Sequence, residues 1–243
     1  MFTLNSLLFD TTTGNYNTNL TTLLKLVNDC DENSLIVAPE VCLTSYDYDN
    51  LDEVLEFANI ANEELKKASK NKIIILTMLE KIDDKVYNLA KIFYNGQVVY
   101  QRAKARLFRF GDEHKYMLEG SDENIKIVEV AGIKIAIFIC FELRFKELWQ
   151  KSEGADVIAV PSWWGALRTE NFKTLTSALA VMNQCYVVAS DSQNEECTKM
   201  SGIISPMGEV KRNGNKPCLT LPYDKQEIKK MRRYMDVGIK TFG

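Results

Sequence analysis

Short runs of almost wholly apolar residues recur along this chain of 243 residues, for example at Leu35–Ala38, Lys134–Ile139 and Val157–Val160. A strand that is apolar at consecutive positions needs cover on both faces, as in parallel sheets that are flanked by helices. Other strand-like segments are joined by tight turns such as Asn95-Gly96 and must be antiparallel. Together these segments predict mixed sheets in an α/β architecture.

Helical patterns alternate with the strands. Apolar residues recur at helical spacing from Val54 to Ala68 and predict an amphipathic helix of about four turns. Other helices are expected at 19–28, 145–153, 171–184 and 224–234, and strands at 2–9, 72–79, 86–94, 97–100, 125–130, 185–189 and on both sides of Met207-Gly208. No linker or repeat divides residues 1–243, so we expect a single domain. The expected fold is a four-layer α-β-β-α sandwich, in which helices flank two mixed β-sheets.

The composition is that of an ordinary soluble globular protein, with 46% hydrophobic and 26% charged residues. A formal net charge of −3 and a pI near 5.5 give no electrostatic reason for a nucleic-acid partner. The N-terminus lacks the features of a signal peptide, and no apolar run approaches the roughly 20 residues that span a bilayer. We therefore expect a cytoplasmic protein that binds neither nucleic acid nor membrane.

The cysteines are dispersed, without a C-x-x-C pair, and they lie at positions 30, 42, 140, 185, 197 and 218. This dispersal favours free thiols over a disulfide framework. The chain has one histidine, His114, so no cluster has the spacing of zinc ligands, and no metal is expected.

Cys140 stands where a strongly apolar run ends and charged residues begin, which is where a strand can present a nucleophile at the rim of a sheet. A thiol reacts as the thiolate and needs a base or a positive charge nearby. Because histidine is scarce, carboxylates and lysines are the candidates. Glu40 also follows an apolar run, and Lys104 follows the strand that ends at Tyr100. Each residue alone has an ordinary alternative: an inert buried cysteine, a salt-bridged glutamate and a surface lysine.

Three segments, in this order, resemble motifs of the nitrilase, or carbon–nitrogen hydrolase, superfamily. Residues 38–46 are similar to its segment with the catalytic glutamate, and residues 100–107 to its segment with the catalytic lysine. Residues 140–148 closely match its nucleophile motif Cys-Tyr-Asp-Leu-Arg-Phe-Pro-Glu-Leu. The resemblance covers nearly the whole chain, and the residues after Cys140 look like those of the amidase-like branch.

The chain departs from the family pattern at several positions. Ser45 stands where the family has glycine, and Lys146 stands where it has proline. The family's Arg-Ala-x-Glu-Asn is Leu-Ala-Val-Met-Asn at residues 179–183. None of these changes removes a catalytic-type residue, but they leave the subfamily open.

The resemblance implies a mechanism without a cofactor. Glu40 takes the thiol proton, and Cys140 attacks the carbon of an amide to form a thioester. The Lys104 ammonium and the backbone N–H of Phe141 hold the oxyanion. The implied activity is hydrolysis of the non-peptide C–N bond of a small linear amide or N-carbamoyl compound, which releases ammonia or an amine. The alternatives are a catalytically silent member that acts as a binding or assembly module, and a nitrile hydrolase.

Other residues are expected around the site. Glu113 matches a further family glutamate that lines the pocket; its alternative is an exposed loop carboxylate. Of Trp163 and Trp164, one is expected to line the pocket and the other to pack in the core or at an interface. Arg168 either anchors a substrate carboxylate or is a surface arginine.

Two further expectations concern residues outside the reaction itself. Glu142 and Arg144 are expected to form a structural ion pair, and His114 is expected to be a loop residue near the pocket. The resemblance also implies a homodimer, or a higher homo-oligomer, in which the sheet sandwiches of two subunits pack together.

Overall fold

The computed structural model describes residues 2–239, and its strands form two mixed six-stranded sheets. The order in the first sheet is β12 (Cys218–Pro222), β1 (Thr3–Leu7), β2 (Ser34–Val37), β3 (Lys72–Ile82), β4 (Lys85–Tyr94) and β5 (Gln97–Ala103). The order in the second is β11 (Val210–Arg212), β10 (Gly202–Ile204), β9 (Tyr186–Ser190), β8 (Val157–Pro161), β7 (Ile133–Ile137) and β6 (Val128–Val130).

The two sheets share one pattern of strand pairing. Three strands are mutually parallel in each, β1–β2–β3 in the first and β7–β8–β9 in the second. In the first sheet, β12 pairs antiparallel with β1 on one side of this trio, and β4 and then β5 continue the sheet beyond β3 with antiparallel pairing. In the second sheet, β6 pairs antiparallel with β7, and β10 and then β11 continue it beyond β9 in the same way. Because the carboxyl ends of parallel strands lie at the same edge of a sheet, the segments that follow β2, β7 and β8 can meet.

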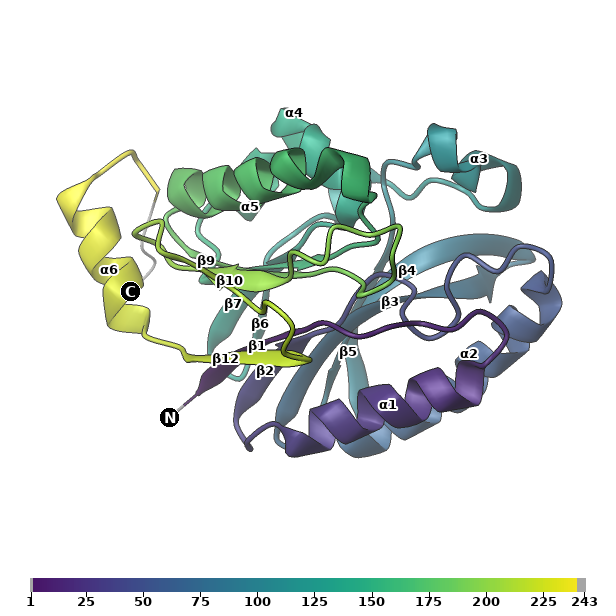
Figure 1. The fold of residues 1–243 in the computed structure, drawn as a ribbon. Helices are drawn as coiled ribbons and strands as arrows, with labels where there is room; N and C mark the ends of the chain where they lie inside the picture. The colour runs from purple at the N-terminus through teal and green to yellow at the C-terminus, as the bar shows by residue number, and fades with distance from the viewer. Residues whose placement is uncertain (1, 240–243) are drawn as a thin grey trace.

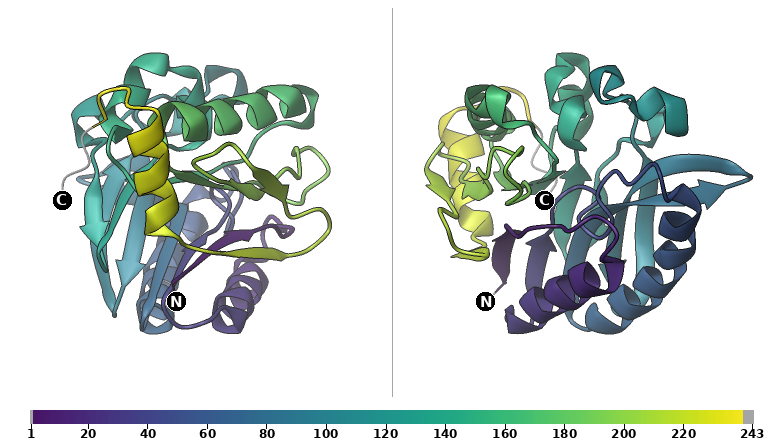
Figure 2. Two further views of the ribbon diagram at one scale, coloured as in Figure 1. Left: turned by 90° about the vertical axis from the view of Figure 1, so that its left-hand side faces the viewer. Right: turned by 45° about the vertical axis from the view of Figure 1, so that its right-hand side comes forward.

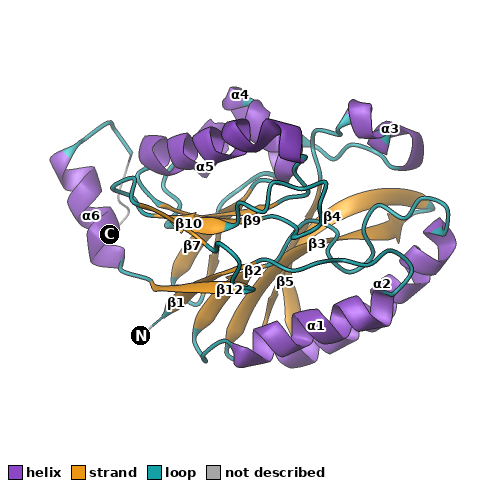
Figure 3. Cartoon of the chain, viewed as in Figure 1, coloured by secondary structure: helices purple, strands orange, loops and turns teal. Residues whose placement is uncertain are grey.

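Helices cover the outer face of each sheet, which gives the expected four layers (Figures 1 and 3). Helices α1 (Tyr16–Asp29) and α2 (Leu51–Ala68) lie against the first sheet. Helix α5 (Thr169–Asn183) and the short α4 (Lys146–Trp149) lie against the second. The prediction of an α-β-β-α sandwich of two mixed sheets is therefore confirmed.

The segment Leu35–Ala38, formed by most of β2 and the residue after it, shows why a strand in a middle layer is apolar at every position. Leu35 and Val37 belong to the core between the two sheets, whereas Ile36 and Ala38 belong to the core between the first sheet and helices α1 and α2. All four are completely buried. Successive side chains of a strand point to opposite faces, so a strand in a middle layer has no face on which water would favour a polar residue.

Helix α2 forms because its sequence meets two requirements of a surface helix. Its buried residues recur every three or four positions and make one apolar face; they are Val54, Phe57, Ala58, Ala61 and Leu65. Acidic residues occupy its first turn and basic residues its last turn, which complements the helix dipole.

Helix α6 (Lys225–Tyr234) stands beside the layers rather than on a sheet face (Figure 2). Its Arg232 donates hydrogen bonds to the carbonyl oxygens of Ala155, at 2.6 Å, and Asn183, at 3.4 Å. Ala155 precedes β8, so α6 closes the end of the second sheet at which the parallel strands begin.

Three predictions about elements were wrong. The strand β12 was missed: it is a half-exposed edge strand that ends in proline, and it pairs with β1, which lies at the other end of the chain. The helix expected at 145–153 divides into α4 and a 3-10 turn, Gln150–Ser152, and the strand expected at 125–130 shortens to β6. Within residues 2–239, no helix is both long enough and apolar enough to cross a bilayer.

Candidate active site

A buried lysine lies between two buried carboxylates. The Nζ of Lys104 donates hydrogen bonds to Oε1 of Glu40, at 2.8 Å, and to Oε1 of Glu113, at 2.7 Å. The three side chains are at most 5% exposed. Lys104 follows β5, Glu40 follows β2, and Glu113 begins the short helix α3 (Glu113–Tyr116), so one cation joins three separate parts of the chain.

The charges in this cluster set one another's protonation. Burial alone would lower the pKa of Lys104, but the Glu40 and Glu113 carboxylates outweigh it and hold that pKa above its ordinary value. For Glu113, burial raises the pKa, although Lys104 opposes the shift. Tyr46 and Asn88 donate hydrogen bonds to Glu113 and Glu40, respectively. The ammonium is therefore held charged within a buried cluster.

The turn that carries Glu40 has a strained backbone. Val41 has a φ of 43°, in the left-handed region, where a β-branched residue is rare. Ser45, at a φ of 56°, occupies the place of the glycine in the family motif, and glycine adopts that conformation at little cost. The Glu40 N–H donates to the Ser162 carbonyl at 3.2 Å, which ties this turn to the segment after β8.

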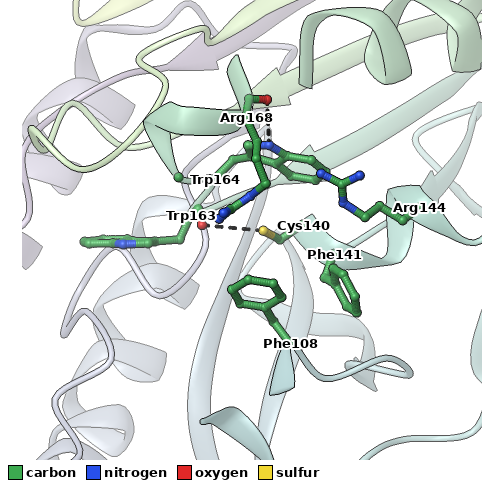
Figure 4. A pocket seen from close by; sticks show the side chains of 8 residues that line it. Phe108, Cys140, Phe141, Arg144, Trp163, Trp164 and Arg168 are labelled. Atoms are coloured by element: carbon green, nitrogen blue, oxygen red, sulfur yellow. Dashed lines mark hydrogen bonds between the residues drawn. The ribbon is translucent and has the colours of Figure 1, made fainter. Parts of the chain in front are cut away.

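Cys140 lies at a second strained turn. Its φ of 43° is again left-handed, and it opens a 3-10 turn, Cys140–Arg144, three residues after the end of β7 at Ile137. The Sγ donates to the carbonyl oxygen of Trp163 at 3.6 Å (Figure 4). The N–H of Trp163 donates to Oε2 of Glu40 at 3.1 Å. The backbone of one residue in the segment after β8, Trp163, therefore contacts both Cys140 and Glu40.

The Cys140 thiol is held in its protonated form. Burial raises its pKa well above the ordinary value, the Glu40 carboxylate adds to the shift, and Lys104 opposes it. The thiol therefore interacts electrostatically with both groups that the sequence singled out. A thiol in this state needs a base to remove its proton before it can attack.

Glu142 forms an ion pair, but not with the partner that the sequence suggested. Its carboxylate accepts hydrogen bonds from both terminal nitrogens of Arg102, at 2.8 and 2.5 Å, and both side chains are at most 1% exposed. It also accepts from the N–H groups of Ala105 and Ile139, at 2.7 Å each. Ala105 follows Lys104 in the sequence, and Ile139 precedes Cys140. Their hydrogen bonds to the same Glu142 carboxylate therefore hold the segments of Lys104 and Cys140 together.

Arg144 is therefore not the partner of Glu142, and that prediction was wrong. The Arg144 side chain is exposed, lies over the ring of Trp164 at 5.0 Å and donates to Asn171. The Arg168 guanidinium lies over the ring of Phe108 at 5.3 Å. Both arginines line the opening above Cys140, shown in Figure 4.

This opening has a volume of about 250 Å³. Four of the residues around it are aromatic, and Cys140 lies at its base (Figure 4); the aromatic residues are Phe108, Phe141, Trp163 and Trp164. The small volume, the aromatic walls and the two guanidinium groups suit a small ligand that carries a negative charge.

Both tryptophans line the opening, and Trp164 also packs in the core, so the expectation of one pocket residue and one core residue holds in part. Trp163 is half-buried and packs edge-on against Tyr46, whereas Trp164 is buried against Phe172 and lines the opening as well. Glu113 is buried, which rules out its alternative as an exposed carboxylate. His114 is exposed on α3.

Asp191 is a buried carboxylate that sequence reasoning missed. Its Oδ1 accepts from the N–H of Trp164 at 2.8 Å, and its Oδ2 accepts from the N–H and hydroxyl of Thr198, at 3.0 and 2.5 Å. It therefore fixes the segment that carries both tryptophans. The sequence Ser190-Asp191-Ser192 resembles an ordinary polar loop, and no local signal distinguishes it.

Across residues 2–239, no group of three or more histidine, cysteine, aspartate or glutamate side chains could hold a metal ion.

Comparison with known proteins gives a consistent result. The sequence profile of the carbon-nitrogen hydrolase family matches residues 10–217. The chain is 32% identical over 216 residues to the 2-oxoglutaramate amidase of Bacillus subtilis, and the aligned region covers 84% of this chain and 83% of that protein. It is 29% identical over 187 residues to a deaminated glutathione amidase of Escherichia coli, and the aligned region covers 72% of this chain and 71% of that protein.

Solved structures share the fold at low sequence identity. A carbon-nitrogen hydrolase from Helicobacter pylori superimposes with a TM-score of 0.86 at 15% identity, over 97% of this chain and 93% of that one. Nit3 of Saccharomyces cerevisiae, a member of the nitrilase superfamily, gives 0.84 at 20% identity, over 100% and 97%. At these identities the likeness concerns the fold alone.

The ionisation of Asp191 should appear in the pH dependence of stability. Burial raises its pKa to about 7, although its hydrogen bonds oppose the shift, against about 4 in an unfolded chain. Between pH 4 and 7 the folded state keeps a proton that the unfolded state releases, so the free energy of unfolding falls as the pH rises and levels off above pH 7.

We expect the Asp191→Asn variant to lose this contribution, which is up to about 4 kcal/mol for three pKa units. Urea unfolding of both proteins from pH 4.5 to 8 measures it. If the two curves of unfolding free energy against pH run parallel, Asp191 does not titrate in this range.

Proposed function

Because this chain belongs to the carbon–nitrogen hydrolase family, we propose that it is an amidase that cleaves the non-peptide C–N bond of a small linear amide or N-carbamoyl compound through a cysteine thioester. The resemblance found in the sequence is thereby confirmed at the level of the family. The observation that carries the proposal is the buried Glu40–Lys104 ion pair, which the backbone of Trp163 links to Cys140 at the edge of a small opening.

In the first half of the proposed reaction, Glu40 takes the proton of the Cys140 thiol as the sulfur attacks the carbonyl carbon. The resulting tetrahedral intermediate carries a negative oxygen, which the Lys104 ammonium and the N–H of Phe141 stabilise. When the C–N bond breaks, the departing nitrogen takes the proton from Glu40. The enzyme is left as a thioester at Cys140.

In the second half, Glu40 takes a proton from water, and the hydroxide oxygen attacks the thioester carbon. The C–S bond then breaks, the carboxylic acid leaves, and the thiol recovers its proton. The raised pKa of the thiol supports this scheme, because a protonated resting thiol requires the base that Glu40 supplies. Glu113 is proposed to hold Lys104 in place through their 2.7 Å hydrogen bond.

The residues around the opening favour an amide that carries a carboxylate. Arg144 and Arg168 both line it and can bind an anionic group. The names of the similar proteins, 2-oxoglutaramate amidase and deaminated glutathione amidase, fit small substrates of this kind. We propose these arginines as the groups that recognise the substrate's charged end.

The two alternatives have less support. A catalytically silent binding module has no need of a buried lysine between two carboxylates, an arrangement that is costly to desolvate. A nitrile hydrolase would use the same three residues, but the two similar proteins described above are named as amidases.

We also propose that the protein forms a homodimer through helix α5 and the neighbouring turn. Val181, Met182 and Met207 are 43%, 65% and 63% exposed. A Cβ at Gly208 would lie 3.2 Å from Val181, so the turn and the helix form one continuous apolar surface. Exposed apolar surface of this kind is typical of subunit contacts.

The activity test is ammonia or amine release from a panel of amides, nitriles and N-carbamoyl compounds of up to about six carbons. We expect release from at least one amide and a loss of more than 1,000-fold in kcat in Cys140→Ala, because the nucleophile is gone. Folding of the variant is checked by circular dichroism. No turnover of any compound would favour the silent module, and turnover of nitriles alone would favour the nitrile hydrolase.

The arginine proposal predicts a selective effect on substrate binding. In Arg144→Ala and Arg168→Ala, we expect KM to rise about 10- to 100-fold for an amide with a carboxylate, because a charged hydrogen bond is worth about 1.5–3 kcal/mol. The KM for the neutral amide of the same length should stay unchanged. Arg109→Ala, at an exposed arginine outside this opening, serves as the control. Equal effects on both substrates would contradict the proposal.

The dimer is tested by light scattering coupled to gel filtration. We expect wild type to elute as a dimer and Met182→Glu to shift toward the monomer, because the new charge would be buried in the contact. The matched control is Ile60→Glu on α2, where the apolar side chain is 56% exposed on another surface. A monomeric wild-type protein would overturn this part of the proposal.

A further inference from the structure

The two oxygens of the Glu40 carboxylate have unlike surroundings. Oε1 accepts hydrogen bonds from Nζ of Lys104, at 2.8 Å, and from Nδ2 of Asn88, at 2.9 Å. Within residues 2–239, Oε2 accepts one hydrogen bond, from the N–H of Trp163 at 3.1 Å. Each oxygen of a carboxylate can accept about two hydrogen bonds. Oε1 is therefore fully occupied, whereas Oε2 has room for one more donor.

The two oxygens also belong to different sides of the site. Asn88 and Lys104, which hold Oε1, come from the first sheet, where Asn88 lies in β4 and Lys104 follows β5. Trp163, which holds Oε2, follows β8 in the second sheet, and its carbonyl oxygen accepts from Sγ of Cys140 at 3.6 Å. The oxygen with room for a further donor is therefore the one on the side of the nucleophile.

Asn88 is bonded to both members of the Glu40–Lys104 ion pair. Its side chain donates to Glu40, and its backbone carbonyl oxygen accepts from the N–H of Lys104 at 2.8 Å. The residue is completely buried, and its Oδ1 has no hydrogen-bonding partner among the described residues. Burial of an unpaired acceptor costs free energy, which an apolar side chain of similar shape would avoid. The position is therefore better explained by the donor of the amide than by stability.

Lys104 alone does not fix the orientation of the carboxylate. An ammonium group has three donors on a flexible stem, and the last torsion angle of a glutamate side chain is broadly distributed. The Asn88 amide is planar, and it comes from the middle of β4, which pairs with β3 on one side and with β5 on the other. A second donor of fixed direction at Oε1 therefore determines where Oε2 of Glu40 points.

We propose that Asn88 is a positioning residue, which together with Lys104 holds Oε1 of Glu40 and thereby presents Oε2 as the oxygen that takes the Cys140 proton. This inference rests on the proposed amidase function and adds the identity of the basic oxygen. As the sulfur forms its bond to the carbonyl carbon, its proton passes to Oε2, and the π electrons of the carbonyl group move to its oxygen. When the C–N bond breaks, the departing nitrogen takes that proton, and the carboxylate is restored.

The first test compares kcat and KM of wild type and Asn88→Leu, with the best amide of the activity panel. Leucine has a similar shape but donates no hydrogen bond. We expect kcat to fall about 10- to 100-fold, because a hydrogen bond to a charged group is lost. KM should stay unchanged, since Asn88 does not line the opening. The matched control is Asn5→Leu, at another completely buried asparagine of the first sheet, which bonds to Thr3 and Thr220 and should keep the wild-type kcat.

Asn88→Asp keeps the shape of the side chain and gives a second readout. The titratable groups of this cluster are Glu40, Lys104, Glu113 and Tyr46. Two carboxyl groups that share a site raise the pKa of one of them. Below that pKa the new carboxyl group is protonated and donates to Oε1 as the amide does, whereas above it two carboxylates repel each other. We therefore expect the ratio of its kcat to that of wild type to fall as the pH rises from about 5 to 9. A ratio that does not change with pH would contradict the proposal.

Crystal structures separate this inference from the proposed function, because they do not depend on turnover. In Asn88→Leu we expect the Glu40 carboxylate to rotate, so that the Trp163 N–H no longer lies within hydrogen-bonding distance of it. If Asn88→Leu does not fold, Asn88→Asp at high pH gives the same comparison. A wild-type protein that hydrolyses no compound of the panel contradicts the amidase proposal, and the orientation of Glu40 then decides the role of Asn88. A carboxylate that keeps its wild-type orientation, or an unchanged kcat in Asn88→Leu, would overturn the inference.

Discussion

The ammonium of Lys104, held between two carboxylates, is the interaction on which the rest of the site depends. Removing three charged groups from water is costly, and only close pairing with full hydrogen bonding offsets that cost. The Glu40 turn, the end of β5 and helix α3 must therefore be placed within hydrogen-bonding distance at once. The sheet sandwich makes this possible, because it gives each of these segments a rigid strand or a packed helix to start from. Loss of the cation would leave two carboxylates facing each other without a counterion, so the cluster is as much a structural requirement as a chemical one.

The two sheets supply different residues of the site. Glu40 and Lys104 come from the first sheet, whereas Cys140 and both tryptophans come from the second. The backbone of Trp163 joins the halves, because its carbonyl contacts the thiol and its N–H contacts Glu40. Residues that would recognise a substrate lie on the loops above. Side chains at the mouth can therefore vary without disturbing the buried charges.

Much of the fold and part of the site could be predicted from the sequence, for identifiable reasons. The apolar run Leu35–Ala38 is a local pattern, and it correctly indicated a strand in a middle layer. Glu40 and Cys140 follow such runs and Lys104 follows a predicted strand, so the placement of all three after strands was foreseeable. The partner of Glu142 was not, because Arg102 lies 40 residues away in sequence and the pairing exists only in the folded chain. Asp191 and β12 were missed for the same reason: tertiary contacts, not local patterns, define them.

The left-handed backbone at Cys140 has a consequence for how this protein tolerates change. A residue with a side chain costs on the order of 1 kcal/mol in this conformation, and glycine does not. Glycine at position 140 would relax the turn, and it would also remove the sulfur. Under the proposed mechanism, that substitution would give a more stable chain without a nucleophile, so the strain of this turn is tied to the presence of the thiol.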